Sequence, residues 1–186
     1  MNNMNNKKII ALIVAAVIGA AALPSCGEKE PVGEVTKAFT SLSDIGNAVK
    51  TQLGDDYFGD LTIDAEILDA MFGVKAEWVE NFFGEMAQIS DAHNDRFVLV
   101  KATEGHATDV ENAFKDYLEF DFNSERQYPQ HVQKTKAAQV YRNGDYVALV
   151  ITGPVDTNAD DYTNYKNALD SNLKAISVIE EYIGRK

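Results

Sequence analysis

Few residues in the sequence have types and spacings that could do chemistry. Asp91, His93 and Asp95 lie close together and could hold a metal ion, because imidazole nitrogens and carboxylates are zinc ligands. Asparagine and aspartate also supply tight-turn conformations, so we interpret this segment as a solvated hairpin turn. Residues 156–161 resemble the start of a calcium loop but lack the glycine and the later glutamate of an EF-hand. We therefore predict no metal site.

Motifs of nucleophilic and phosphate-handling enzymes are missing from the sequence. It contains no Gly-x-Ser-x-Gly segment, no glycine-rich phosphate loop and no pair of histidines spaced around a glutamate. With 29 acidic residues, a carboxylate pair of the kind that glycosidases use could arise anywhere and is uninformative. We assign no catalytic residue. Two functions stay open: a non-enzymatic binding or accessory protein, which the missing motifs favour, and a cell-wall hydrolase with paired carboxylates.

The only cysteine, Cys26, follows an apolar run. Residues 9–23 contain no polar side chain and come behind two lysines, which is typical of a secretory signal and too short for a membrane-spanning helix. Leu23, Ser25 and Cys26 resemble the lipobox of bacterial lipoproteins. That resemblance implies cleavage before Cys26 and a covalent diacylglycerol and fatty acyl group on its sulfur, with no other cofactor.

The lipobox divides the chain into a signal peptide (1–25), a flexible tether (26–36) and a single domain (37–186). On this interpretation lipid holds the protein to the cell membrane on its extracytoplasmic side. Removing residues 1–25 takes away two lysines and no acid, which changes the net charge from −12 to −14. A chain this acidic has a large excess of negative charge, whereas binding to phosphates needs lysine and arginine. We therefore expect no nucleic acid as a partner. We expect an envelope protein or peptide as its partner.

Hydrophobic spacing and capping residues predict the helices. Apolar residues recur every three to four positions over 40–53, which predicts a helix there. Asp64 and Gly73 have the types of an N-cap and a C-terminal stop and predict a short helix over 64–72. Two further helices are predicted at a Thr108–Glu111 capping box and behind Thr157 and Asp160. The last helix has an expected apolar stripe of Tyr162, Tyr165, Leu169, Leu173, Ile176, Ile179 and Ile183.

Apolar and β-branched runs predict the strands. We expect strands over 83–90 and 96–102, and a type I′ hairpin around Asn143-Gly144. The order strand–strand–helix then occurs twice, which predicts an α+β domain. Its four-stranded antiparallel sheet would come from two hairpins, with helices packed mainly on one face. The other face would be open to water or a partner.

Aromatic residues crowd the first half of the domain. We interpret most of them as core residues, since aromatic side chains dominate core burial. Any exposed set on the open sheet face or around Trp78 would be the docking patch, and the candidates are Trp78, Phe82 and Phe83.

Two segments carry a family resemblance. Residues 73–114 run from GVKAEW to VENAF and residues 140–152 read VYRNGDYVALVIT. Both resemble bacterial lipoproteins classed under domain of unknown function 4358, in which a lipobox and linker precede acidic and aromatic residues, a helix opening with Asp-Val, and a Gly-[Asp/Asn]-Tyr-Val hairpin. The resemblance covers about 68–152. It implies an extracytoplasmic address and a compact α+β domain, and no activity or site residue.

Overall fold

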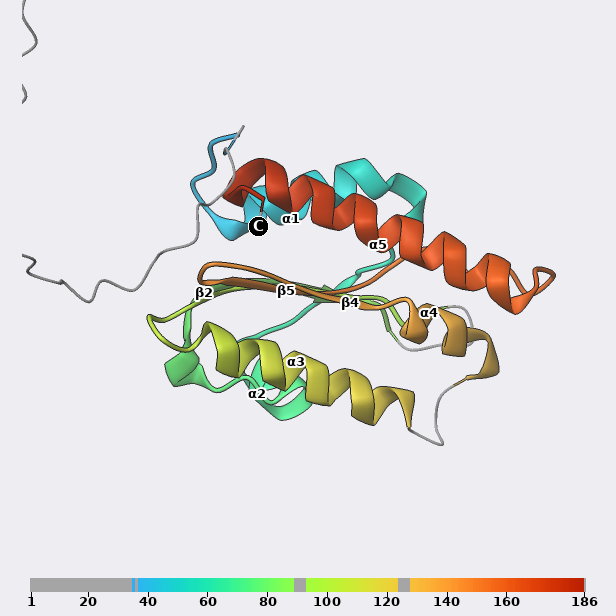
Figure 1. Ribbon diagram of the computed structural model, residues 1–186, viewed down its shortest axis with the longest axis horizontal. Helices are drawn as coiled ribbons and strands as arrows, with labels where there is room; N and C mark the ends of the chain where they lie inside the picture. The colour runs from blue at the N-terminus through green and yellow to red at the C-terminus, as the bar shows by residue number, and fades with distance from the viewer. Residues whose placement is uncertain (1–34, 36, 89–92, 124–127, 186) are drawn as a thin grey trace, which may run out of the picture. The chain divides into compact units, whose positions relative to one another are not determined.

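The computed structural model describes residues 35, 37–88, 93–123 and 128–185, and shows an antiparallel sheet between two layers of helices (Figure 1). In chain order its elements are α1 (Leu42–Leu53), the 3₁₀ turn η1 (Gly54–Asp56), β1 (Leu61–Thr62), α2 (Ala65–Phe72), η2 (Ala76–Trp78), β2 (Val79–Met86), β3 (Arg96–Ala102), α3 (Ala107–Phe122), η3 (Pro129–His131), α4 (Val132–Lys136), β4 (Gln139–Asn143), β5 (Tyr146–Ile151) and α5 (Asp161–Ile183).

The sheet has five strands in the order β1-β2-β3-β5-β4, and every neighbouring pair is antiparallel. The α+β class is confirmed, whereas the prediction of four strands is wrong because β1 adds an edge strand beside β2. The predicted strand–strand–helix repeat is also wrong. The helices α1 and α2 and the strand β1 precede β2, and both η3 and α4 stand between α3 and β4.

Helices cover both faces of the sheet, which corrects the prediction of helices mainly on one face. On β3, Val98 and Val100 join a core with residues of α2 and α3, while Phe97 and Leu99 join a second core with residues of α1 and α5. Successive side chains of a strand point to opposite faces, so a strand buried on both sides needs two covers. The unbroken apolar run of β3 is the sequence sign of that double burial.

Local chemistry explains where the first helices begin and end. The side chain of Asp64 accepts a hydrogen bond from the backbone N–H of Ile67 at 2.9 Å, which caps α2. Gly73 ends α2 in the left-handed conformation that glycine tolerates, with φ of 71°. The prediction of a short helix between these two residues is confirmed.

The predicted capping box of α3 is wrong. The helix begins at Ala107 with His106 at the N-cap position. The hydroxyl of Thr108 instead accepts a hydrogen bond from Arg142 of β4 at 2.8 Å. The carboxylate of Glu111 binds Arg142 and Lys115. Thr108 and Glu111 therefore join α3 to β4 at the edge of the sheet, and Glu111 also pairs with Lys115 on the surface of α3 itself.

The strand boundaries follow from pairing with β3. Antiparallel pairing joins Val79 to Ala102 and Met86 to Arg96, so β2 begins and ends earlier than the predicted 83–90. Residues 89 and 90 of that prediction lie outside the described residues. The predicted β4–β5 hairpin is present, but Asn143 pairs with Tyr146, so its two loop residues are 144 and 145 and not the predicted pair 143 and 144.

The last helix begins where predicted, but its buried face is different. Asp160 caps it by accepting the N–H of Thr163 at 2.8 Å. Two residues of the expected apolar stripe, Tyr162 and Leu173, are 73% and 48% exposed. Its buried positions are Ala168, Ser171, Asn172, Ala175, Val178, Ile179 and Ile183. Within the described part of the chain, no helix is long and apolar enough to cross a bilayer.

Candidate functional site

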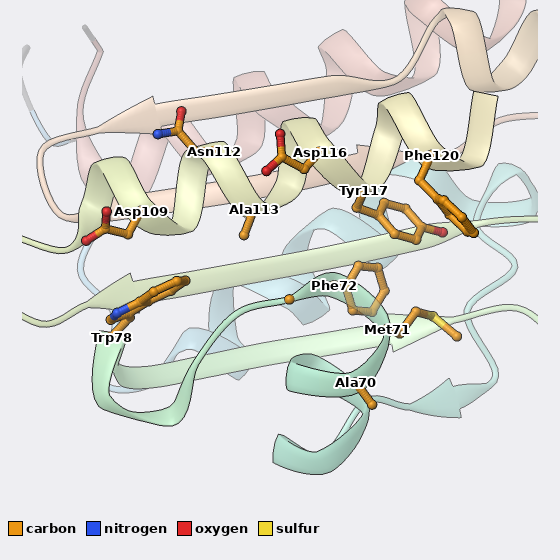
Figure 2. A pocket seen from close by; sticks show the side chains of 11 residues that line it. Ala70, Met71, Phe72, Trp78, Asp109, Asn112, Ala113, Asp116, Tyr117 and Phe120 are labelled. Atoms are coloured by element: carbon orange, nitrogen blue, oxygen red, sulfur yellow. The ribbon is translucent and has the colours of Figure 1, made fainter. Parts of the chain in front are cut away.

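A groove of about 430 Å³ lies between α2 and α3, on the side of these helices that the sheet does not cover (Figure 2). Figure 2 shows Asp109 and Trp78 at one end, and Met71 and Phe120 at the other. The residues that line it are Ala70, Met71, Phe72, Gly73, Trp78, Asp109, Asn112, Ala113, Asp116, Tyr117 and Phe120.

The unequal lengths of the two helices create this groove. Helix α2 ends after 8 residues at Gly73, whereas α3 continues for 16 residues. Lining residues of α3 recur at spacings of three and four from Asp109 to Phe120, so they form one stripe along the helix. Part of this stripe extends past the short neighbour and stays open to solvent.

The floor of the groove is aromatic. Phe72 is buried, and its ring centre lies 4.7 Å from that of Tyr117 and 6.3 Å from that of Phe114. Burial raises the pKa of the Tyr117 phenol, so this side chain stays neutral at physiological pH. At one end, the Trp78 ring stacks on the imidazole of His106 at 6.3 Å. These contacts fix the floor before any ligand binds.

Two large apolar side chains at the open end of the groove are exposed. Met71 of α2 is 40% exposed and Phe120 of α3 is 75% exposed. Figure 2 shows Phe120 next to Tyr117 and Met71 next to Phe72, at the same end of the groove. Exposed apolar side chains of this size, rimmed by polar residues, are typical of an interaction site.

The rim of the groove is acidic. Asp109 binds the Nδ1 atom of His106 at 2.8 Å. Asp116 is exposed and forms no hydrogen bond or ion pair with the described residues. The lining contains no lysine or arginine. The groove therefore combines an apolar floor with a carboxylate that no described residue neutralises.

The three predicted docking aromatics do not form one surface. Trp78 lines the groove, and Phe82 packs between the sheet and the α2–α3 layer. Phe83 lies on the opposite face of β2, with its ring 5.9 Å from that of Phe97. Met71 and Phe120 were not singled out from the sequence, because apolar residues in predicted helices are read as core.

The histidines lie in separate environments. His93 stacks on Phe58 at 4.0 Å, His106 contacts Trp78, and the ring of His131 lies 5.5 Å from that of Tyr128. Asp91 of the conceivable metal cluster lies outside the described residues. Within those residues, no group of three or more histidine, cysteine, aspartate or glutamate side chains could hold a metal ion.

A second group of charges is buried where β3 begins. The Nζ of Lys134 in α4 donates to the carboxylate of Asp95 at 2.7 Å and to the carbonyl oxygen of Gly153 at 2.6 Å. The Lys134 and Asp95 side chains are 1% and 3% exposed. Arg96, also buried, donates to the Asp95 and Ala87 carbonyl oxygens at 2.7 and 3.2 Å.

Burial is the main influence on both members of this ion pair. It raises the pKa of Asp95 and lowers that of Lys134, and each charge opposes the effect on the other. Perturbed groups of this kind occur at functional sites and in structural ion pairs alike. These side chains are almost fully buried and do not line the groove, so we interpret the pair as a structural link between β3, α4 and Gly153.

Comparison with known proteins places this architecture in a family. Residues 53–152 match the family described as Domain of unknown function (DUF4358). No curated protein and no solved structure gave a significant match. The matched segment contains all five strands and every residue that lines the groove. Because the match covers more than half of the 186 residues, the chain belongs to the DUF4358 family.

Proposed function

We propose that the protein is a lipid-anchored binding domain on the extracytoplasmic side of the cell membrane. Its α2–α3 groove takes an apolar segment that carries lysine or arginine, from an envelope protein or peptide. The observation that carries this proposal is that one groove is lined both by the exposed apolar side chains of Met71 and Phe120 and by Asp116, whose carboxylate has no partner among the described residues. One ligand chemistry, an aliphatic side chain beside a cation, satisfies all three residues.

The apolar part of the site favours a peptide ligand. Covering exposed apolar surface contributes about 25 cal/mol per Å². Met71 is unbranched and flexible, and methionine adapts to partners of different shape. A groove of about 430 Å³ lies within the size range of ligand sites, about 300–1,000 Å³. Several aliphatic side chains of one segment therefore fit on the floor between α2 and α3.

The charge of the site favours a basic ligand. A lysine or arginine at Asp116 would form a charge-assisted hydrogen bond, which is stronger than one between neutral groups. The whole chain has a net charge of −12, so its field attracts cationic segments and repels acidic ones. Complementarity of this kind contributes more to association rate and specificity than to affinity.

The proposed anchor is supported by Leu23, Ser25 and Cys26 behind an apolar run. Two or more acyl chains on Cys26 would hold the protein stably at a membrane, whereas one chain binds only marginally. Mass spectrometry of the protein from its native host tests this part. We expect a mature chain that begins at a diacylglyceryl-modified Cys26, and an unmodified cysteine behind an intact leader would contradict it.

The groove gives little support to the hydrolase alternative. Asp109 and Asp116 are seven residues apart on α3, about 10 Å along the helix axis. The two carboxyl groups of glycosidases are about 5–9.5 Å apart. Asp109 is also engaged by His106. The geometry therefore favours a binding site.

Peptide binding to the full chain tests the groove. The probe is a fluorescein-labelled peptide of leucine and lysine, compared with the same peptide carrying glutamate for lysine. We expect the anisotropy to rise only with the lysine peptide, and Asp116→Asn to weaken binding about tenfold through loss of one charged hydrogen bond.

The matched control is Glu119→Gln, which removes one charge from α3 outside the groove lining. A general charge effect would weaken binding equally in both variants, whereas the proposal expects Glu119→Gln to bind like the unmodified protein. Equal binding of both peptides, or equal weakening in both variants, would contradict the proposed site.

A further inference from the structure

We infer that the end of the domain where α1 begins and α5 ends faces the bilayer, and that Phe39, Tyr146 and Tyr182 contact the lipid headgroup region. This inference rests on the lipid anchor at Cys26 proposed above. It concerns a surface that is separate from the α2–α3 groove, because none of the three aromatic residues lines that groove.

Three segments are tied together at this end of the domain. Figure 1 shows the start of α1, the end of α5 and the β4–β5 turn side by side. The backbone N–H of Lys37 donates to the Glu181 carbonyl oxygen at 2.8 Å. The side chain of Asn143 donates to the carbonyl oxygens of Ile183 and Gly184 at 3.0 and 2.9 Å. The surface they form is therefore held in a fixed shape.

This surface is aromatic, and Lys37 is the one charged residue among its described lining residues. The ring of Phe39 meets those of Tyr146 and Tyr182 edge-on, each with ring centres 6.3 Å apart. The three rings lie on the walls of a shallow pocket of about 350 Å³, whose remaining lining residues are Val35, Lys37, Ala38 and Ile183. All three aromatic side chains are half-buried, and Val35 is 51% exposed.

The composition matches a membrane interface. Tyrosine has an apolar ring and a polar tip, and lysine extends an apolar stem that keeps its ammonium in water. The Lys37 ammonium lies 5.4 Å from the centre of the Tyr182 ring. No acidic side chain is among the described residues that line the pocket. The Lys37 ammonium therefore favours, and does not oppose, contact with lipid phosphates.

Four of the charges beside the surface form two ion pairs. Lys37 pairs with Glu181, and Arg185 pairs with Glu180 at 3.1 Å. Each exposed pair contributes little to stability. Their effect here is to leave no net charge from these four residues beside the aromatic rings.

The length of the chain between Cys26 and Val35 sets an upper limit on their separation. Val35 is the ninth residue after Cys26, so the two cannot be more than about 32 Å apart. A tether of this length gives an effective concentration in the millimolar range, and a weak contact is then enough to orient the domain. The other end of α5 is 23 residues away along the helix, about 34 Å, and is the less accessible end.

Paramagnetic NMR on the lipidated full chain tests the orientation. The protein is placed in phosphatidylcholine nanodiscs that contain a lipid with a gadolinium chelate on its headgroup. We expect amide signals of Phe39, Tyr146 and Tyr182 to be broadened at least twofold more than those of α4. Phe39→Ser with Tyr182→Ser should remove this difference, whereas Tyr162→Ser, at the far end of α5, should preserve it.

The possible outcomes distinguish a failure of this inference from a failure of the proposed lipid anchor. Uniform broadening of a chain whose Cys26 carries lipid would overturn the inference and leave the anchor standing. An unmodified Cys26 in the native protein would overturn both. Broadening that disappears on dilution, together with a dimer in light scattering, would assign the surface to a second copy and overturn the lipid contact.

Discussion

Two carboxylates of this domain, Asp95 and Asp116, are held in opposite ways. Asp95 is buried at the start of β3 and paired with Lys134, whereas Asp116 is exposed on α3 and has no partner among the described residues. Desolvating a charge costs several kcal/mol, so a buried carboxylate persists only with a counter-charge. An exposed carboxylate is hydrated and loses little without a partner. The comparison separates a charge that folding requires from one that a ligand can use.

The largest effect should follow from breaking the buried pair. In Lys134→Met, Asp95 keeps its burial and loses the ammonium 2.7 Å away, and Gly153 loses a hydrogen bond to its carbonyl oxygen. We expect the free energy of unfolding to fall by about 3–5 kcal/mol in urea denaturation. The double variant Asp95→Asn with Lys134→Met should lose less. A loss below about 1 kcal/mol in the single variant would show that the pair is not structural.

The loss of stability in Lys134→Met should depend on pH. Burial already raises the pKa of Asp95, and loss of Lys134 raises it further, with His93 and Arg96 as the remaining positive influences. Because the folded state binds a proton at Asp95 more tightly than the unfolded state does, the free energy of unfolding rises as pH falls. The deficit of Lys134→Met should therefore shrink from pH 7 towards pH 4, as urea midpoints measure. A constant or growing deficit would contradict this assignment.

A smaller effect should appear at the α1–sheet contact. A Cβ atom at Gly46 would lie 2.4 Å from the ring of Phe83. Gly46→Ala gains about 1 kcal/mol of helix propensity but overpacks this contact at a cost of about 1–3 kcal/mol. We expect net destabilisation by thermal unfolding. The reference variant is Phe83→Leu with Gly46→Ala, in which the smaller side chain should recover part of the loss.

The sequence predicted elements whose signals are local. Asp64 and Gly73 bound α2 because a cap and a left-handed stop act within one helical turn. The run over 96–102 became β3 with the predicted bounds. Strand β1 was missed, because its two residues pair with β2 and carry no periodic pattern. The helices on the second face of the sheet were not predicted, although the unbroken apolar run of β3 indicates burial on both faces.

The candidate site and the buried ion pair were harder to predict because one residue of each has the reverse of its usual environment. Lys134 is buried and Phe120 is exposed. Average preferences place lysine outside and phenylalanine inside. Only the packing of α4 against α3 and α5, and the short length of α2, decide these positions. Trp78 was predicted as a docking residue and does line the groove.

The central claim is that Asp116 serves a ligand and not the fold. The most direct measurement combines urea unfolding of Asp116→Asn with its affinity for the leucine–lysine peptide. The account predicts a stability change within about 0.5 kcal/mol, as for exposed positions, and affinity about tenfold weaker. Unchanged affinity, or a loss of stability comparable to that of Lys134→Met, would contradict it.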